Sequence, residues 1–155
     1  MKLLKQGDPR WSNVTIGNTK LKLSRFGCTI TALSMLSDYF ASLDGKYHDP
    51  AQLAKSLSFT QNGLLLWSSV RPMTTGFHFE WRQYDFNPEK IDVSLKDPKK
   101  AVLLEVMIPN VGKHWVVALR RIPLTQTYWI ADPIDGKRKL SRVYGKPTGS
   151  AHFIL

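Results

Sequence analysis

The clearest structural signal in the sequence is the segment Cys28-Thr-Ile-Thr-Ala-Leu-Ser-Met-Leu-Ser-Asp-Tyr-Phe40. Counted from Cys28, apolar residues recur at offsets of 4, 7, 8, 11 and 12, which is the spacing of one face of an amphipathic helix. Gly27 supplies the turn into this segment. The pattern predicts a helix from Cys28 to about Phe40, with the cysteine in its first turn.

Other signals surround this helix in the first half of the chain. Residues 1–26 are polar and rich in Gly, Pro and Asn, which favours extended chain and loop. Asp49 and Asn87 each precede a proline, so each predicts a helix cap followed by the first helical position. The patterns predict a helix over 50–57, a helix over 60–70 weakened by Gly63, a strand over 77–81 and a helix over 88–95.

The second half of the chain is rich in strand signals. Residues 101–108 form an apolar run broken only by Glu105, as expected for a central strand buried on both faces. Residues 114–119 and 128–131 are rich in β-formers, and 137–140 follow the turn signal Asp135-Gly136. Helices first and antiparallel strands later predict an α+β fold, in which N-terminal helices pack on a C-terminal antiparallel sheet.

The composition indicates one domain over residues 1–155, because 155 residues that are 43% hydrophobic can bury a real core. With 22 Lys and Arg against 12 Asp and Glu, the formal charge is +10, which favours anionic partners such as bacterial wall polymers, an acidic membrane surface or nucleic acid. One cysteine excludes an internal disulfide, a cysteine-built zinc site and a CxxC redox pair.

Several common features are not expected. The opening Met-Lys-Leu-Leu-Lys has no signal-peptide core, and no stretch has the length of a membrane span. We therefore expect synthesis in the cytoplasm without a signal peptide, and delivery by a holin, a virion or a secretion system for any action at a cell wall. The histidines His48, His78 and His152 lack the spacing of a metal motif, so neither a metal nor a cofactor is expected.

A predicted hairpin brings two polar residues together. If the strands at 114 and 128 pair about Pro123, His114 lies directly opposite Asp132. Opposed residues in an antiparallel pair have Cβ atoms about 4.5–5.5 Å apart, within reach of a hydrogen bond from imidazole to carboxylate. A slip by one residue would move them to opposite faces.

Cys28 provides a nucleophile for this pair. A thiol in the first turn of a helix has a lowered pKa, and an imidazolium nearby lowers it further. A thiolate, a base and a group that orients the base are the three parts of nucleophilic acyl transfer, and Cys28, His114 and Asp132 supply them. Each residue also has an ordinary reading: Cys28 as core packing, His114 as a strand end and Asp132 as part of a turn in which Asp135 is the competing carboxylate.

Four segments together resemble a known family. They are Gln6-Gly-Asp-Pro-Arg-Trp11, Phe26-Gly-Cys-Thr-Ile-Thr-Ala-Leu-Ser-Met35, His114-Trp-Val-Val117 and Tyr128-Trp-Ile-Ala-Asp-Pro133. In order and spacing they resemble the C39-like family of papain-fold cysteine peptidases, over roughly residues 6–144. The resemblance implies a papain-like fold with the nucleophile at the start of a helix, Cys28 as nucleophile, His114 as base and Asp132 as its orienting group.

The resemblance also implies that Gln6 donates to the oxyanion beside the backbone N–H of Cys28. In the exporter-linked peptidases of this kind the glutamine lies only a few residues before the cysteine, whereas Gln6 is 22 residues before Cys28. Relatives of this fold cleave leader peptides and wall peptides, and include amidases and acyltransferases.

The predicted function is therefore a cysteine peptidase, with an amide bond of peptidoglycan as the leading substrate, as in a bacterial or phage lysin. One alternative is a processing peptidase for a protein or leader peptide. An alternative of another class is a basic nucleic-acid-binding domain without enzymatic activity. Its candidate contacts are Trp81-Arg82, Arg120-Arg121 and Lys137-Arg-Lys139, although no recognised nucleic-acid motif accompanies them.

Overall fold

The computed structural model describes residues 1–43 and 46–155. Five α-helices and two 3-10 turns occur in these ranges: α1 (Leu23–Phe26), α2 (Cys28–Ala41), α3 (Pro50–Ser56), α4 (Pro72–Thr75), α5 (Pro88–Lys96), η1 (Trp67–Ser69) and η2 (Ser141–Tyr144). The strands are β1 (His78–Gln83), β2 (Lys100–Ile108), β3 (Gly112–Arg121), β4 (Tyr128–Asp132), β5 (Lys137–Leu140) and β6 (Gly149–Ile154). None of the helices in the described ranges is long and apolar enough to cross a bilayer.

The strands form a six-stranded sheet in the order β1-β6-β2-β3-β4-β5, and every neighbouring pair is antiparallel. The expected α+β class is therefore confirmed. Strand β6 was not predicted, although it lies inside the sheet between β1 and β2. It follows β5 in sequence but pairs with β1 and β2, which come much earlier. A turn signal between neighbouring segments therefore could not predict it.

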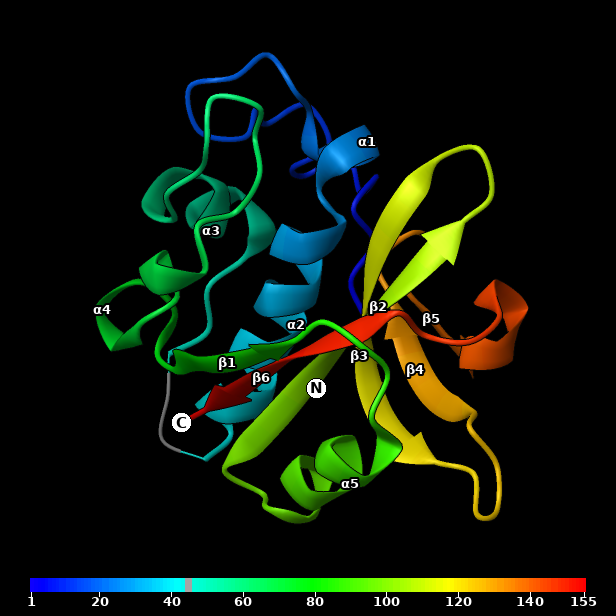
Figure 1. Ribbon diagram of the computed structural model, residues 1–155. Helices are drawn as coiled ribbons and strands as arrows, with labels where there is room; N and C mark the ends of the chain where they lie inside the picture. The colour runs from blue at the N-terminus through cyan, green and yellow to red at the C-terminus, as the bar shows by residue number, and fades with distance from the viewer. Residues whose placement is uncertain (44–45) are drawn as a thin grey trace.

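Two apolar layers cover the two faces of the sheet, with α2 on one side and α5 on the other (Figure 1). Alternation along the central strands separates them, because successive side chains of a strand point to opposite faces. Leu103 and Val117 belong to the layer that contains α2, whereas Leu104 and Val116 belong to the layer that contains Ile91 of α5. This is why β2 reads as a continuous apolar run.

Helix α2 begins at Cys28, as the sequence predicts, and Gly27 is essential to that start. The backbone of α1 returns so closely that a Cβ on Gly27 would lie 2.5 Å from the Leu23 carbonyl oxygen and 2.9 Å from Leu23 Cα. The two helices thus meet at a residue without a side chain. This contact fixes the first turn of α2, and with it Cys28, relative to α1.

The predicted caps of α3 and α5 are confirmed. Asp49 accepts a hydrogen bond of 2.8 Å from the Gln52 N–H, and Gln52 Oε1 accepts one of 2.9 Å from the Asp49 N–H. Asn87 Oδ1 accepts one of 3.1 Å from the Lys90 N–H. In each helix the cap satisfies a backbone donor that the helix itself leaves unpaired.

The predicted helix over 60–70 is wrong. The Thr60 N–H donates to the Leu64 carbonyl at 2.8 Å, and Gly63 has a φ of 79°, so the chain makes a tight turn there. An isolated bridge joins Phe59 to Leu65 across this turn. A glycine in the left-handed region ends a helix, and only η1 remains of the predicted one.

Candidate active site

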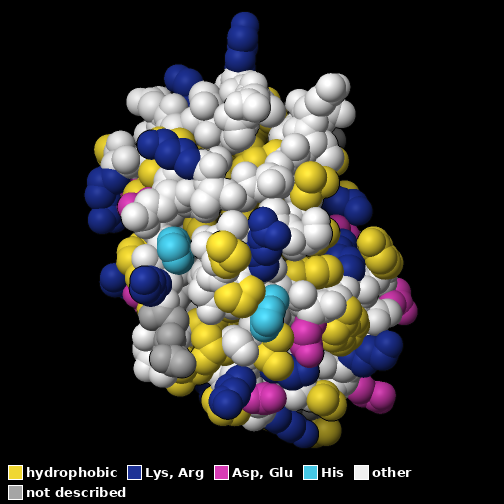
Figure 2. Space-filling view, turned by 90° about the vertical axis from the view of Figure 1, so that its left-hand side faces the viewer, with side chains coloured by type: hydrophobic (Ala, Val, Ile, Leu, Met, Phe, Trp, Pro, Cys, Tyr) yellow, Lys and Arg dark blue, Asp and Glu magenta, His cyan; other side chains and the backbone are white. Residues whose placement is uncertain are grey.

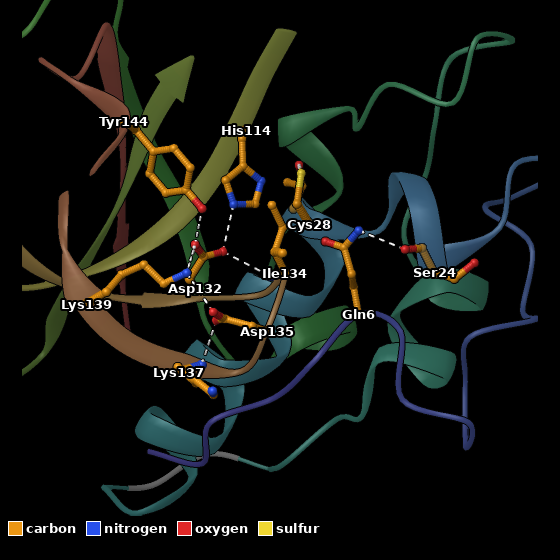
Figure 3. A network of polar contacts seen from close by, with 11 residues as sticks. Gln6, Ser24, Cys28, His114, Asp132, Ile134, Asp135, Lys137, Lys139 and Tyr144 are labelled. Carbon is orange, nitrogen blue, oxygen red and sulfur yellow. Dashed lines mark hydrogen bonds and ion pairs between the residues drawn. The ribbon is translucent and has the colours of Figure 1, made fainter. Parts of the chain in front are cut away.

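Cys28 lies in the first turn of α2, half-buried beside the His114 ring (Figure 3). Its Sγ atom is 3.9 Å from Thr29 Oγ1. Burial alone would raise the pKa of the thiol, but the adjacent His114 and its charge, together with the Trp115 backbone N–H, lower it below its ordinary value. The site therefore favours the thiolate.

His114 on β3 and Asp132 at the end of β4 are both buried and directly bonded. Nε2 of His114 lies 2.8 Å from Oδ1 of Asp132, so Nδ1 is the ring nitrogen that remains for the thiol. Burial would lower the pKa of His114, but the hydrogen bonds to Asp132 and Cys28 raise it to about 9. A pKa raised in this direction favours the imidazolium, whose Nε2–H donates to the carboxylate.

The register that produces this contact differs from the predicted one. The turn joins Ile122 to Thr127, through a hydrogen bond of 2.8 Å from the Ile122 N–H to the Thr127 carbonyl, and is centred beyond Pro123. A bulge at Leu119 separates two registers, Arg120↔Trp129 with Arg121↔Tyr128 and Val117↔Ala131 with Ala118↔Ile130. Continued to the end of β4, the second register places Asp132 opposite Val116. The predicted register is therefore wrong by two residues.

The bulge at Leu119 keeps His114 and Asp132 on the same face. Compared with the predicted pairing of β3 and β4, the position of the turn alone shifts the register by an odd number of residues. Because the side-chain period of a strand is two, that shift would put His114 and Asp132 on opposite faces. The extra residue makes the displacement even. His114 and Asp132 become diagonal neighbours, a separation of about 7–8 Å between backbones that an imidazole and a carboxylate can span.

Asp132 is fully buried and has a partner on each side of its carboxylate. Besides His114, Oδ1 accepts a 3.0 Å hydrogen bond from the Ile134 N–H. Oδ2 accepts a hydrogen bond from the Tyr144 hydroxyl and lies 3.0 Å from Nζ of Lys139. Burial would raise the pKa of Asp132, but the hydrogen bonds from His114, Tyr144 and Ile134 hold it well below its usual range. The group is an anion at every physiological pH.

Tyr144 and Lys139 are site residues that the sequence did not predict. Tyr144 stands on η2, outside the predicted elements, and no spacing rule connects it to Asp132. Lys139 was assigned only as a possible phosphate contact, but its Nζ lies 2.7 Å from Asp135 Oδ2 as well as near Asp132. Asp135, the competing carboxylate, thus contacts Lys139, while the carboxylate that contacts His114 belongs to Asp132.

Gln6 is buried in the same region, between segments that carry the site. Its backbone N–H donates to the Pro133 carbonyl at 2.8 Å, and its side-chain Nε2 donates to the Ser24 carbonyl at 3.0 Å. In the view of Figure 3 its amide lies between Cys28 and Ser24. Oε1 of Gln6 is buried and has no hydrogen-bond partner among the described residues. Nε2 carries a second hydrogen that Ser24 does not use.

The histidines outside this site are not part of a cluster of possible metal ligands in the described part of the chain. Within residues 1–43 and 46–155, no three His, Cys, Asp or Glu side chains are grouped to hold an ion. His152 is completely buried between two serines, with Nδ1 2.8 Å from Ser94 Oγ and Nε2 2.9 Å from Ser150 Oγ. Its two nitrogens are thus occupied by neutral partners.

Some of the side chains suggested for nucleic-acid contact have partners within the protein, whereas Arg120, Lys137 and Arg138 are exposed. The Trp81 ring stacks on His152 at 3.7 Å between centroids. Arg82 forms a 2.6 Å ion pair with Glu105, and Arg121 forms one of 2.7 Å with Asp92. On the face shown in Figure 2, Lys and Arg side chains are scattered among neutral and apolar ones and form no stripe.

The sequence matches no model of a known protein family and no curated protein.

Proposed function

We propose that the protein is a cysteine peptidase, or a close hydrolytic relative, of the papain-like C39-like kind. The observation that carries the proposal is the alignment of a thiol of lowered pKa, a histidine of raised pKa and a buried carboxylate bonded to that histidine. A helix that begins at the thiol and packs on an antiparallel sheet bearing the other two groups supports the papain-like assignment. Perturbed titratable groups in direct contact are typical of catalytic sites.

The proposed reaction begins from the thiolate of Cys28. The sulfur attacks the carbonyl carbon of an amide, and the carbonyl oxygen takes the electron pair of the π bond. His114, already protonated, gives its Nδ1 proton to the leaving nitrogen as the C–N bond breaks, which leaves a thioester. Water then attacks the thioester while His114 takes its proton, and the carboxylic acid departs as the thiolate re-forms. Asp132 keeps the imidazolium stable and oriented throughout.

The negative oxygen of the tetrahedral intermediate requires donors. The backbone N–H of Cys28 is one candidate, because it lies at the N-terminus of α2 where the helix leaves its first N–H groups unpaired. The Nε2 hydrogen of Gln6 that Ser24 does not use is the second. The contacts to Ser24 and Pro133 hold Gln6 in place before a substrate arrives, so its orientation costs nothing during the reaction.

The leading substrate is a peptide or isopeptide bond of bacterial peptidoglycan. The formal charge of +10 draws the protein toward an anionic wall, since a field of one sign raises the rate of encounter with an oppositely charged polymer. The net charge favours encounter with the wall polymer. Which bond of that polymer is cleaved depends on the contacts around Cys28.

The test combines thiol reactivity with digestion. We expect iodoacetamide to alkylate wild-type Cys28 at pH 7 faster than a free cysteine of ordinary pKa, as measured by mass spectrometry of the intact protein. We also expect new amino groups to appear when purified peptidoglycan is incubated with the protein, and none with the Cys28→Ala variant. A wild-type thiol no more reactive than free cysteine would contradict the proposal.

The same digestion distinguishes the alternatives. Cleavage of a protein or leader peptide without any effect on peptidoglycan would keep the chemistry and change the substrate. If instead the protein bound DNA with a steep dependence on salt, and Cys28→Ala changed neither binding nor any hydrolysis, the domain would be a nucleic-acid-binding module.

A further inference from the structure

Tyr144 contacts both members of the His114–Asp132 pair, although the proposed reaction needs no third side chain there. Its hydroxyl donates to Asp132 Oδ2, the oxygen that faces away from His114. Its ring packs edge-on against the His114 ring, with 5.6 Å between centroids and an interplanar angle of 66°. One side chain therefore restricts the carboxylate and covers the imidazole (Figure 3).

Lys139 adds a positive charge at the same oxygen. Its Nζ lies 3.0 Å from Asp132 Oδ2 and 5.9 Å from the centre of the Tyr144 ring. Asp135 holds the ammonium from the other side at 2.7 Å. A carboxylate that is fully buried costs free energy unless its charge is compensated and its oxygens are hydrogen-bonded. Here Tyr144 and Lys139 meet that requirement at Oδ2.

The four contacts on Asp132 leave its carboxylate one orientation. Oδ1 is occupied by His114 and the Ile134 N–H, and Oδ2 by Tyr144 and Lys139. Rotation about the Cβ–Cγ bond would break contacts at both oxygens together. Without the pair at Oδ2, the carboxylate could turn away from His114 or take up a proton.

We propose that Tyr144 is a positioning residue that, together with Lys139, keeps Asp132 ionised and turned toward His114. The inference rests on the proposed function, because it assigns Tyr144 to the thiolate–imidazolium pair of that reaction. Tyr144 does not touch the reacting atoms. It acts through Asp132 on the charge of His114, and through His114 on the thiolate of Cys28.

The charged and titratable groups around His114 come from several elements. Glu105 of β2, whose backbone pairs with Trp115, is already bound to Arg82 at 2.6 Å and to Lys113 at 3.3 Å. Those that face the His114–Asp132 pair are Cys28 of α2, Lys139 of β5, Tyr144 of η2 and, through Lys139, Asp135 of the turn before β5.

A second tyrosine–aspartate–cation cluster at the other end of β4 provides a matched control. The Tyr128 hydroxyl donates to Asp92 Oδ1 at 2.9 Å, and Asp92 Oδ2 forms a 2.7 Å ion pair with Arg121. The chemistry is the same, but the carboxylate has no histidine among its hydrogen-bond partners in the described ranges. A purely structural role for tyrosine would give Tyr128→Phe and Tyr144→Phe equal effects.

The experiment measures the rate of Cys28 alkylation by iodoacetamide as a function of pH, which requires no substrate. Tyr144→Phe removes only the hydroxyl and keeps the ring. We expect its thiol pKa to rise by about one unit, so that the whole pH profile of alkylation moves about one pH unit upward relative to wild type. We expect the Tyr128→Phe profile to superimpose on the wild-type profile, even if denaturation shows a similar loss of stability.

A Tyr144→Phe profile that coincides with the wild-type one would overturn the inference while leaving the proposed function intact. If Tyr144→Phe does not fold, Lys139→Met takes its place, with a shift in the same direction expected and no shift overturning the inference. Failure of the proposed function has a different signature, because wild-type Cys28 itself would then react like a free cysteine.

Discussion

His114 and His152 are both buried in strands of one sheet, yet their surroundings shift their pKa values in opposite directions. Around His114 stand Asp132 and the thiol of Cys28, whose hydrogen bonds and charges outweigh burial and raise its pKa to about 9. Around His152, burial and nearby lysines lower its pKa to about 4. Burial alone favours the neutral imidazole, so an adjacent anion is what makes a buried histidine a charged group.

The neutral form of His152 fits its neighbours well. A neutral imidazole has one donor and one acceptor nitrogen, and the hydroxyls of Ser94 and Ser150 can serve either role. Lys90 and Lys100 oppose a further positive charge. The comparison teaches that the two buried histidines of this fold are distinguished by the partners that the sheet brings to them, and each of the following predictions tests that distinction.

The largest expected effect comes from exchanging the two histidines for alanine in separate variants. His114→Ala should lower turnover by roughly 10²–10⁴-fold, the usual contribution of a general acid–base group. His152→Ala should lose stability but retain the turnover of its folded fraction. The measurement is the rate of peptide-bond hydrolysis by each variant, divided by its concentration of folded protein. Equal losses in both variants would mean that His114 has no special role.

The next effect separates Asp132 from Asp135. Asp132→Asn removes the anion that holds His114 charged, so the pKa of His114 should fall and turnover should drop by about tenfold or more. Asp135→Asn loses the ion pair with Lys139 but keeps an oxygen that can accept from the Lys137 N–H, and should cost less. Kinetics of both variants on one substrate give the answer. Full activity in Asp132→Asn with loss in Asp135→Asn would assign the orienting role to Asp135.

A smaller effect is expected around His152. Ser94→Ala leaves Nδ1 of a completely buried histidine without its partner, which should lower the free energy of unfolding by about 1–3 kcal/mol. Urea denaturation measures this, with Ser68→Ala at an exposed position as the control. Alkylation of Cys28 should not change. A slower alkylation in Ser94→Ala would show that the two ends of the sheet are coupled.

The last effect is a difference in pH dependence. His152 has a lowered pKa, so the stability it contributes is present above about pH 6.5, its unfolded value, and is lost as the pH falls through about 4. The difference in unfolding free energy between wild type and His152→Gln should narrow over that interval. A gap that is constant between pH 7 and pH 4 would contradict the lowered pKa.

His114 should behave differently because Cys28 titrates with it. A raised histidine pKa by itself gives stability that is full below about pH 6.5 and is lost as the pH rises through about 9. The lowered thiol pKa has the opposite dependence and offsets much of this loss up to the usual thiol value near 8.5. Histidine NMR should therefore show midpoints of about 9 for His114 and about 4 for His152.

Much of the local structure could be predicted because its signals lie within a few residues of each other. The apolar stripe after Cys28 gives α2, and the Asp49 and Asn87 caps give the starts of α3 and α5. Where two local signals conflicted, as at Gly63, the glycine turn prevailed over the apolar spacing. The sequence also predicted the chemical groups of the candidate site, a thiol, an imidazole and a carboxylate.

The arrangement of those types depended on contacts between distant segments. The register of β3 on β4 follows from a turn centred beyond Pro123 and a bulge at Leu119, and neither leaves a clear sequence pattern. Strand β6 carries His152 into the sheet beside β1 and β2, because backbone donors and acceptors there need partners that no neighbouring segment supplies.

By itself, the sequence determined the three longer helices α2, α3 and α5, most strands and the residue types available for chemistry, because helical periodicity and capping act over one or two turns of chain. Only the tertiary structure decided which histidine meets an anion, and that Tyr144 and Lys139 hold Asp132. A pKa is set by the charges and hydrogen bonds within a few ångströms of a group. In this fold the members of the cluster around His114 and Asp132 come from five different elements, α2, β3, β4, β5 and η2.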